Sequence, residues 1–312
     1  MNLVIGGNGG LGLAITEELL SQGKTVTATY HRLSDALQSL SGPLLTTKPL
    51  DIREQGSLEE LLKEVNTVYF CLNVPYQDWY TVMPQALESL TDQLNSSQKL
   101  VFPGNVYGYG KFQYLPADEK HPKAAETRKG QLRNHLEESL KGQAEKQGFR
   151  YVIPRYPDYF GPNVTNRVFG PIFTGALKSK VLSWPGKLDA PHDLVYIRDA
   201  AKAAVILAES GEKGEWHVSG AGAIAGEQFL NLVQDEAGSP RKCRSLPGWA
   251  VGLAGLFDKE AKEFHELLYE FEYPLVLDEN KFKKRFPTYA ATPHTKAVKE
   301  TLRWFREGQP QK

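Results

Sequence analysis

The chain opens with Met1-Asn2-Leu3-Val4-Ile5-Gly6-Gly7-Asn8-Gly9-Gly10-Leu11-Gly12, and this stretch decides the fold. An apolar strand runs directly into Gly6-x-x-Gly9-x-x-Gly12, and the pattern predicts a helix over residues 13–22. In such a loop, the backbone N–H groups and the positive end of the next helix bind a pyrophosphate. Glycine permits the sharp turn, the close approach of the phosphate and tight packing of helix on strand. We therefore expect a dinucleotide-binding βαβ unit whose cofactor contacts include Gly6, Gly9, Gly10, Leu11 and Gly12.

Length and composition describe a chain that can build a full core. It has 312 residues, 41% of them hydrophobic, and a formal net charge of zero. A neutral chain lacks the bulk charge that holds nucleic acid or an acidic membrane, so we expect neither partner. The two cysteines, Cys71 and Cys243, and the absence of a signal peptide or a long apolar run predict a cytoplasmic protein. Cys71 lies in an apolar strand and is expected to be a small core residue.

Strand and helix patterns alternate over the first half of the chain. This alternation predicts an α/β fold with a doubly wound parallel sheet of the Rossmann type in a domain of residues 1–160. The predicted strands are 24–30, 44–50, 67–72, 99–103 and 150–154, and the predicted helices are 58–65, 83–94 and 127–147.

The amino-acid composition changes beyond about residue 160, where glycine, proline and aromatic residues cluster over 161–191. Residues 161–312 are therefore predicted to form a smaller α+β, substrate-binding part, interleaved with the last strands of the sheet. Its predicted elements are strands 194–197 and 215–219 and helices 198–209, 226–237 and 295–306.

The end of the second strand usually determines which dinucleotide binds, because it meets the adenosine ribose. Here it reads Thr29-Tyr30-His31-Arg32, with no carboxylate to accept a bond from a 2′-hydroxyl. Arg32, helped by His31, can pair with a 2′-phosphate, so the sequence favours NADP over NAD. The alternative is that Arg32 is a solvated loop cation. Asp51 is expected to accept from the adenine amine, with Ile52 against the ring, unless Asp51 only caps a helix.

Several further segments, taken in their order along the chain, resemble the motifs of a known protein family. They are Leu50-Asp51-Ile52, Val68-Tyr69-Phe70-Cys71-Leu72-Asn73, Leu100-Val101-Phe102-Pro103-Gly104-Asn105-Val106-Tyr107-Gly108, Arg155-Tyr156-Pro157-Asp158-Tyr159-Phe160-Gly161-Pro162 and His192-Asp193-Leu194-Val195-Tyr196-Ile197-Arg198-Asp199-Ala200-Ala201. Together with the opening loop, they make the chain resemble the extended short-chain dehydrogenases/reductases, the NAD(P)-dependent epimerase/dehydratase group. The resemblance implies a Rossmann fold and places Leu72 and Asn73 beside the cofactor.

The resemblance also implies a catalytic Tyr, a Lys four residues later and a Ser or Thr, and here all three positions differ. The usual Tyr-Gly-x-Ser-Lys aligns with Lys129-Gly130-Gln131-Leu132-Arg133, and Asn105 stands where the Ser or Thr is expected. In one interpretation, Arg133 holds the nicotinamide ribose, Asn105 donates to a carbonyl oxygen and Lys129 supplies the proton. For Lys129, a solvated lysine on a charged helix is the alternative.

Two other interpretations stay open. A nearby tyrosine can take over as the acid, and the candidates are Tyr107, Tyr109, Tyr156 and Tyr159. Otherwise the chain binds NADP without turnover, as a regulator or scaffold. The leading prediction is an oxidoreductase that acts on an unidentified small carbonyl or alcohol.

No metal site is predicted, because the seven histidines show no metal-ligand spacing. The predicted helix 127–147 has only a narrow apolar stripe, made of Leu132, Leu136, Leu140 and Ala144. Such a stripe packs a helix onto its own sheet but leaves little apolar surface for a partner. We therefore expect a monomer or a weak homodimer.

Overall fold

The computed structural model describes residues 1–54, 56–239, 242–255 and 257–308, and the chain divides into two compact units. The first unit contains Met1–Asn105, Gln131–Arg155 and Ala200–Trp216, and the second contains Val106–Gly130, Tyr156–Asp199 and His217–Lys312. The chain therefore passes repeatedly from one unit to the other.

The first unit is built on an eight-stranded sheet. Its strands are β1 (Asn2–Ile5), β2 (Val26–Tyr30), β3 (Leu45–Pro49), β4 (Thr67–Phe70), β5 (Lys99–Val101), β6 (Gly104–Asn105), β7 (Arg150–Tyr156) and β12 (Gly214–His217). They lie in the order β12-β7-β5-β4-β1-β2-β3, and β6 pairs with β7. The pairs from β7 through β5, β4, β1 and β2 to β3 are all parallel. The strand order reverses after β3, so the predicted doubly wound α/β fold is confirmed.

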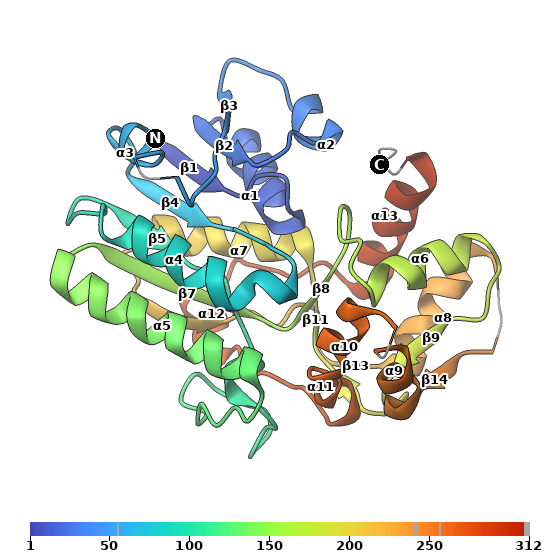
Figure 1. The fold of residues 1–312 in the computed structure, drawn as a ribbon. Helices are drawn as coiled ribbons and strands as arrows, with labels where there is room; N and C mark the ends of the chain where they lie inside the picture. Colours follow the sequence, from blue (N-terminus) through green and yellow to red (C-terminus); the bar gives the residue numbers. More distant parts are fainter. Residues whose placement is uncertain (55, 240–241, 256, 309–312) are drawn as a thin grey trace. The chain divides into compact units, whose positions relative to one another are not determined.

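Helices cover both faces of this sheet. They are α1 (Gly10–Ser21), α2 (Asp35–Ser39), α3 (Glu59–Leu62), α4 (Trp79–Thr91), α5 (Arg128–Gln147) and α7 (Ile197–Glu209), with a 3₁₀ turn, η1, at Tyr76–Asp78. Figure 1 shows α4 and α5 on the near side of the sheet and α7 on the far side. Burial on two faces explains why Leu3, Val4 and Ile5 of β1 have almost no exposed surface.

The second unit has small strand pairs and a core rich in aromatic residues. Its strands are β8 (Asp158–Phe160), β9 (Ser183–Pro185), β10 (Pro191–His192), β11 (Leu194–Tyr196), β13 (Ile224–Ala225) and β14 (Arg244–Leu246), and a 3₁₀ turn, η2, spans Tyr107–Tyr109. Its helices are α6 (Phe169–Leu177), α8 (Gly226–Ala237), α9 (Gly248–Ala254), α10 (Lys259–His265), α11 (Tyr269–Glu272), α12 (Asn280–Arg285) and α13 (His294–Glu307). Phe160, Phe173 and Phe229 lie at the centre of the core, against α6, α8 and α13.

One segment of this unit contains a helix for which the sequence analysis made no prediction. Residues 161–191 are rich in glycine, proline and aromatic residues, yet α6 lies among them. Its glycines serve packing: a Cβ on Gly170 would lie 3.0 Å from the Thr165 carbonyl oxygen, and one on Gly175 would lie 3.0 Å from Leu182. Composition alone cannot separate a loop from a buried helix that needs small residues. None of the helices in the described ranges is long and apolar enough to cross a lipid bilayer.

Candidate dinucleotide site and the substituted catalytic positions

The glycine loop joins β1 to α1, and its three spaced glycines serve different purposes. Gly6 has φ +83°, and a Cβ there would lie 2.5 Å from the Cys71 carbonyl oxygen. A Cβ on Gly12 would overlap the Gly6 carbonyl oxygen. The protein itself therefore requires glycine at these two positions. A Cβ on Gly9 would lie 3.5 Å from the Gly6 carbonyl oxygen, its nearest atom among the described residues, so the fold does not require glycine there.

Gly9 is the N-cap of α1, with φ −71° and ψ 157°, a conformation open to any residue. No side chain caps this helix, and its first turn carries no acidic residue. The first-turn N–H groups of a helix have no intrahelical acceptor, and the helix dipole adds positive potential at the same end. The start of α1, next to Gly9, therefore offers groups that suit a pyrophosphate. The helix begins at Gly10, three residues earlier than predicted, because Gly10, Leu11 and Gly12 are already helical.

A residue that the sequence analysis overlooked, Asn8, joins this loop to the segment after β2. Its Nδ2 donates to the Arg32 carbonyl, and its Oδ1 accepts from the Ser34 N–H (3.3 Å) and hydroxyl (3.0 Å). His31 and Arg32 themselves are exposed. The sequence did offer a signal for this role, because the Asn8 amide can both donate and accept in the middle of the glycine loop. Asn8 therefore holds the backbone of Arg32 in a defined place beside the loop.

Asp51 follows β3 and already has a partner. The Arg53 Nε donates to Asp51 Oδ1 at 2.8 Å, and the Arg53 Nη2 pairs with Oδ2. These hydrogen bonds from Arg53 are the main reason why the pKa of Asp51 falls to about 2. The Asp51 carboxylate also accepts from the Arg53 N–H at 3.1 Å, so it closes a turn. Its neighbour Ile52 is buried.

The end of β4 lies against the glycine loop. The Cα of Leu72 is 3.1 Å from the position of a Cβ on Gly6, and Asn73 follows as an exposed residue. Cys71, just before them, is buried, and burial raises the pKa of its thiol. The expectation that Cys71 is a core residue is confirmed.

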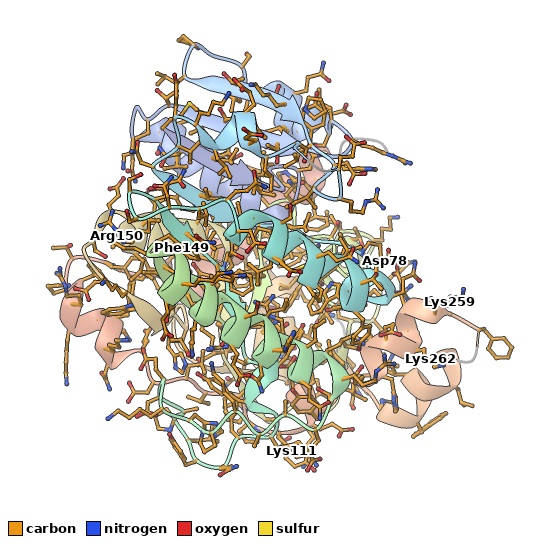
Figure 2. The ribbon with its side chains drawn as sticks, turned by 60° about the vertical axis from the view of Figure 1, so that its left-hand side comes forward. Asp78, Lys111, Phe149, Arg150, Lys259 and Lys262 are labelled. Atoms are coloured by element: carbon orange, nitrogen blue, oxygen red, sulfur yellow. The ribbon has the colours of Figure 1, made fainter. Side chains whose placement is uncertain are left out.

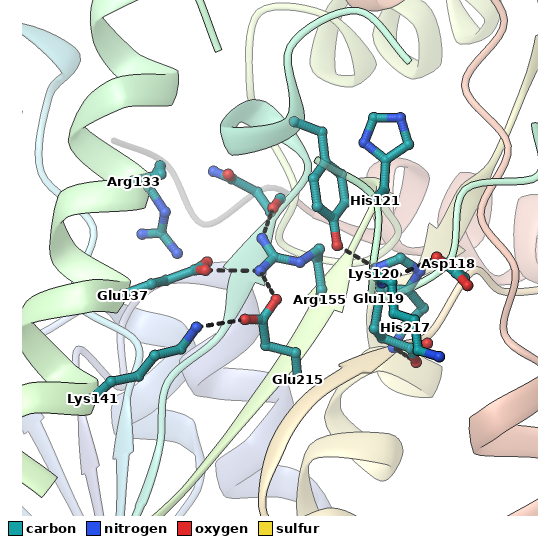
Figure 3. A network of polar contacts seen from close by, with 12 residues as sticks. Asp118, Glu119, Lys120, His121, Arg133, Glu137, Lys141, Arg155, Glu215 and His217 are labelled. Atoms are coloured by element: carbon teal, nitrogen blue, oxygen red, sulfur yellow. Dashed lines mark hydrogen bonds and ion pairs between the residues drawn. The ribbon is translucent and has the colours of Figure 1, made fainter. Parts of the chain in front are cut away.

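Asn105 and Arg133 belong to the first unit, where a buried ion network lies beside them. Arg155 is fully buried; it donates to the Asn105 carbonyl and pairs with Glu137 (2.8 Å) and Glu215 (2.6 Å). Figure 3 shows Arg155 between these two carboxylates, with Lys141 bonded to the other side of Glu215 at 2.8 Å. The network fixes the backbone at Asn105.

Arg133 is also mostly buried. Its Nη2 donates to the Pro103 carbonyl at 2.7 Å, and its guanidinium carbon lies 4.9 Å from the centre of the Phe102 ring. Both partners follow directly from the end of β5. Arg133 is therefore held at the carboxyl end of a central strand, the edge at which parallel α/β sheets bind ligands.

Lys129 belongs to the second unit, and its environment excludes a solvated lysine. Its side chain has no exposed surface, and its ammonium pairs with Glu263 and, at 2.7 Å, with Glu266. The Lys129 backbone N–H also donates to Glu266 Oε1 at 2.9 Å. Both carboxylates belong to the segment that contains α10 and follows it. Lys129 thus connects residues that are more than 130 positions apart in the chain.

The candidate tyrosines differ in exposure. Tyr109 is fully buried, and its hydroxyl lies 2.6 Å from His217 Nε2. His217 Nδ1 lies 3.1 Å from the Ala117 carbonyl oxygen and must donate to it, because that oxygen can only accept. With the proton on Nδ1, Nε2 accepts the hydrogen bond from the Tyr109 hydroxyl. Tyr156 is also fully buried. Tyr107 and Tyr159 are partly exposed, which leaves these two better placed to reach a small molecule.

Comparison with protein families identifies the chain. The model of the NAD dependent epimerase/dehydratase family matches residues 2–219. The protein belongs to this family. A UDP-N-acetyl-alpha-D-glucosaminuronate decarboxylase from Bacillus cytotoxicus is 22% identical over 98% of this chain and 97% of its own length.

Solved structures of similar fold cover nearly the whole chain. UDP-glucose 4-epimerase from Thermotoga maritima, solved with UDP-glucose, has a TM-score of 0.79 at 18% identity and covers 98% of this chain and 99% of its own. dTDP-glucose 4,6-dehydratase from Bacillus anthracis, solved with NAD, has a TM-score of 0.81 at 15% identity and covers 99% of this chain and 97% of its own. At these identities, the likeness establishes the fold.

In this member of the epimerase/dehydratase family, the candidate catalytic residues belong to different units of the chain. Asn105 and Arg133 lie in the first unit, and Tyr107 and Lys129 lie in the second. Lys129 and Arg133 are four residues apart on α5, so they fall on the same side of that helix. Among the described residues, no group of three His, Cys, Asp or Glu side chains is arranged to hold a metal ion.

Proposed function

We propose that this protein binds NADP(H) at the glycine loop of its first unit and works as an oxidoreductase on a small carbonyl or alcohol substrate. The observation that carries the proposal is Gly9. The fold tolerates a Cβ there, whereas a pyrophosphate bound to the start of α1 does not. Residues Gly6 to Gly12 would hold the pyrophosphate, Leu72 and Asn73 would lie beside the cofactor, and Arg133 would hold the nicotinamide ribose.

The choice of NADP over NAD rests on the segment that Asn8 holds. Exposed Arg32 presents positive charge beside the loop, with His31 next to it, and no carboxylate occupies the end of β2. A guanidinium suits a phosphate, because its N–H groups match the oxygen geometry. Family relatives such as the Bacillus anthracis dehydratase were solved with NAD, so this preference would distinguish the present chain.

A bound nicotinamide would supply or accept the hydride, so the protein's own residues would have to orient the substrate and move a proton. Asn105 is partly exposed on a backbone fixed by Arg155, and its amide can donate to a substrate oxygen. Lys129 is committed to two carboxylates, so we assign the proton to Tyr107, which follows Asn105 by two residues and is partly exposed. Lys129 then acts as a positioning residue for the segment that carries Glu263 and Glu266.

The relatives suggest which substrates to try first. The Bacillus cytotoxicus relative is a decarboxylase of a UDP-sugar acid, and the Thermotoga maritima structure holds UDP-glucose. We therefore propose nucleoside-diphosphate sugars as the first class of substrate, followed by free sugars and simple ketones.

A second function, a silent NADP-binding regulator or scaffold, is favoured by one observation. The position that carries the catalytic acid in the family resemblance is Lys129, and its ammonium is buried in ion pairs. Such a protein would bind NADPH through the same loop and would turn nothing over.

One series of measurements tests the binding proposal. NADPH fluorescence titration should show binding to wild type that Gly9→Val abolishes, while circular dichroism stays unchanged because valine fits the backbone of residue 9. Gly42→Val is the matched control, since a Cβ on Gly42 meets nothing within 4 Å. If Gly9→Val binds NADPH like wild type, the loop is not the phosphate site.

The same titrations test the cofactor preference. Arg32→Ala should weaken NADPH binding by about 1.5–3 kcal/mol and leave NADH binding nearly unchanged. The exposed cation Lys63 is the control, and Lys63→Ala should change neither. Equal losses for both dinucleotides would contradict the assignment of NADP. Activity assays with NADPH and the proposed substrates then separate an enzyme from a silent binder. An enzyme should turn over at least one of them, and Asn105→Ala and Tyr107→Phe should each lower that turnover.

A further inference from the structure

The three residues that follow β2, residues 31–33, are exposed and have few hydrogen bonds through their backbone. They include Arg32, the residue that would bind a 2′-phosphate. Within the described part of the chain, the only hydrogen bond to a peptide group of these residues runs from the Asn8 Nδ2 to the Arg32 carbonyl. An exposed backbone that lacks such a bond keeps much of its conformational freedom. Asn8 is therefore the main restraint on the backbone of Arg32.

Asn8 also holds the residue at which α2 is capped. Its Oδ1 accepts from the Ser34 N–H and hydroxyl, and the Ser34 hydroxyl in turn accepts from the Leu37 N–H at 3.2 Å as the N-cap of α2. Leu37 is fully buried, so this helix is anchored in the core of its unit. One amide thus fixes two peptide groups of the segment that leads from β2 into α2, one at Arg32 and one at Ser34.

The other end of this connection is the glycine loop, which is itself well ordered by hydrogen bonds. The Gly7 N–H, just before Asn8, donates to the Thr29 carbonyl of β2 at 2.8 Å. The Gly9 N–H, just after Asn8, donates to the Gly6 carbonyl at 3.1 Å. The backbone of Asn8 is therefore held on both sides, and its side chain extends this order from the glycine loop to the loop after β2.

We propose that Asn8 is a positioning residue that sets the preference for NADP(H) over NAD(H), a role that rests on the proposed binding of the 2′-phosphate by Arg32. Because the Asn8 bonds order the Arg32 backbone before the cofactor arrives, binding has to order only the side chain. Affinity falls when a backbone must also be ordered at the moment of binding. NAD(H) has a hydroxyl in place of the phosphate, so its affinity should depend little on where Arg32 lies.

Fluorescence titrations of the full chain with NADPH and with NADH test this role. Asn8→Ala should weaken NADPH binding by about five- to tenfold, because about one residue of backbone loses its order, and NADH binding by less than about twofold. Asn8→Ser, which also lacks the amide donor, is a second variant and should behave in the same way. Asn2→Ala is the matched control and should change neither affinity, since the Asn2 Nδ2 likewise donates to a backbone carbonyl, that of Thr25 at 3.2 Å, but at the opposite end of β1 and β2.

A double-mutant cycle separates the positioning of Arg32 from a general effect on the glycine loop. In the Arg32→Ala background, Asn8→Ala should weaken NADPH binding by less than about twofold more, because the side chain that it positions is already absent. In the Arg150→Ala background, the full loss should remain. Arg150, labelled in Figure 2, is an exposed cation at the start of the parallel strand β7, whereas Arg32 follows the end of β2, so the two lie at opposite ends of the sheet.

Two results would overturn the role of Asn8 while leaving the NADP site intact. Equal weakening of NADPH and NADH by Asn8→Ala would mean that Asn8 only shapes the pyrophosphate loop. Losses that simply add in the cycle with Arg32→Ala would mean that Asn8 acts independently of Arg32. If Arg32→Ala by itself weakens both dinucleotides equally, the proposed NADP site is wrong, and the role of Asn8 is overturned with it. Retained NADH binding shows in each case that the variant is folded.

Discussion

At the scale of single residues, Lys129 shows how neighbours decide what a side chain can do. Its alkyl chain and ammonium are withdrawn from water, and the ammonium pairs with two carboxylates. Replacing it with methionine keeps the volume but leaves Glu263 and Glu266 together without their cation. We expect Lys129→Met to lower the free energy of unfolding by about 2–4 kcal/mol.

Urea unfolding measures this loss. Lys296→Met, at an exposed position of α13 in the same unit, is the control and should change stability by less than about 0.5 kcal/mol. If the two variants are equally stable, Lys129 does not hold the segment that contains α10.

Asp193 is a second residue whose environment sets its charge. It is buried, and this burial raises the pKa of its carboxyl to about 7, although Oδ2 accepts from the Leu277 N–H at 2.7 Å. The native state therefore binds this proton more tightly than the unfolded chain does. Its contribution to stability is complete below the ordinary pKa of 3.8 and is lost as the pH rises through about 7.

From this shift, Asp193 should make the protein about 2–3 kcal/mol less stable at pH 8 than at pH 5. Asp193→Asn keeps an acceptor for Leu277 but cannot ionise, so the drop between the two pH values should shrink by that amount. Urea unfolding at both pH values measures the difference. An unchanged drop in the variant would mean that Asp193 ionises normally in the folded protein.

At the scale of elements, α5 combines two glycines with opposite requirements. A Cβ on Gly130 would lie 2.5 Å from the Ala125 Cβ and would overlap the Tyr107 carbonyl oxygen. Gly142, three turns later on an exposed position, has nothing within 4 Å of its added Cβ. One glycine lets the start of the helix approach a turn, and the other only weakens the helix.

The two alanine variants should therefore move stability in opposite directions. Gly142→Ala should raise the free energy of unfolding by about 0.5–1 kcal/mol, the difference in helix propensity. Gly130→Ala should lower it by about 1–3 kcal/mol, the usual cost of overpacking. Denaturant midpoints of the pair decide the matter, and equal midpoints would show that the contact at Gly130 relaxes without cost.

At the scale of the whole molecule, the exposed face of α5 is relevant to whether two copies of the chain form a dimer. Leu136 and Leu140 are buried, Leu132 is partly buried, and the exposed positions include Gln131, His135, Glu138 and Glu145. A polar face of this kind offers no apolar surface to a second copy. We predict a monomer at micromolar concentration, measured by light scattering during size-exclusion chromatography. A stable dimer that persists on dilution would contradict this.

The sequence by itself determined the α/β class, the glycine loop and the β1–β5 run of the parallel sheet. It could do so because a buried parallel strand is an unbroken apolar run and because a Gly-rich turn between strand and helix has few other uses. It also located α8 without error, since Gly226 and Gly238 mark its ends and its apolar residues recur at helical spacing between them. Such features can be predicted from sequence, because the residues that determine each of them lie within about a dozen neighbouring positions.

Only the tertiary structure decided the environment of the substituted positions. The partners of Lys129 lie more than 130 residues away, Arg155 gathers carboxylates from two distant elements, and α6 is helical despite its glycines. The bridge from Asn8 to Arg32 likewise joins two loops. Ion pairs and close backbone contacts of this kind depend on which segments meet in space, and no periodicity along the chain records that.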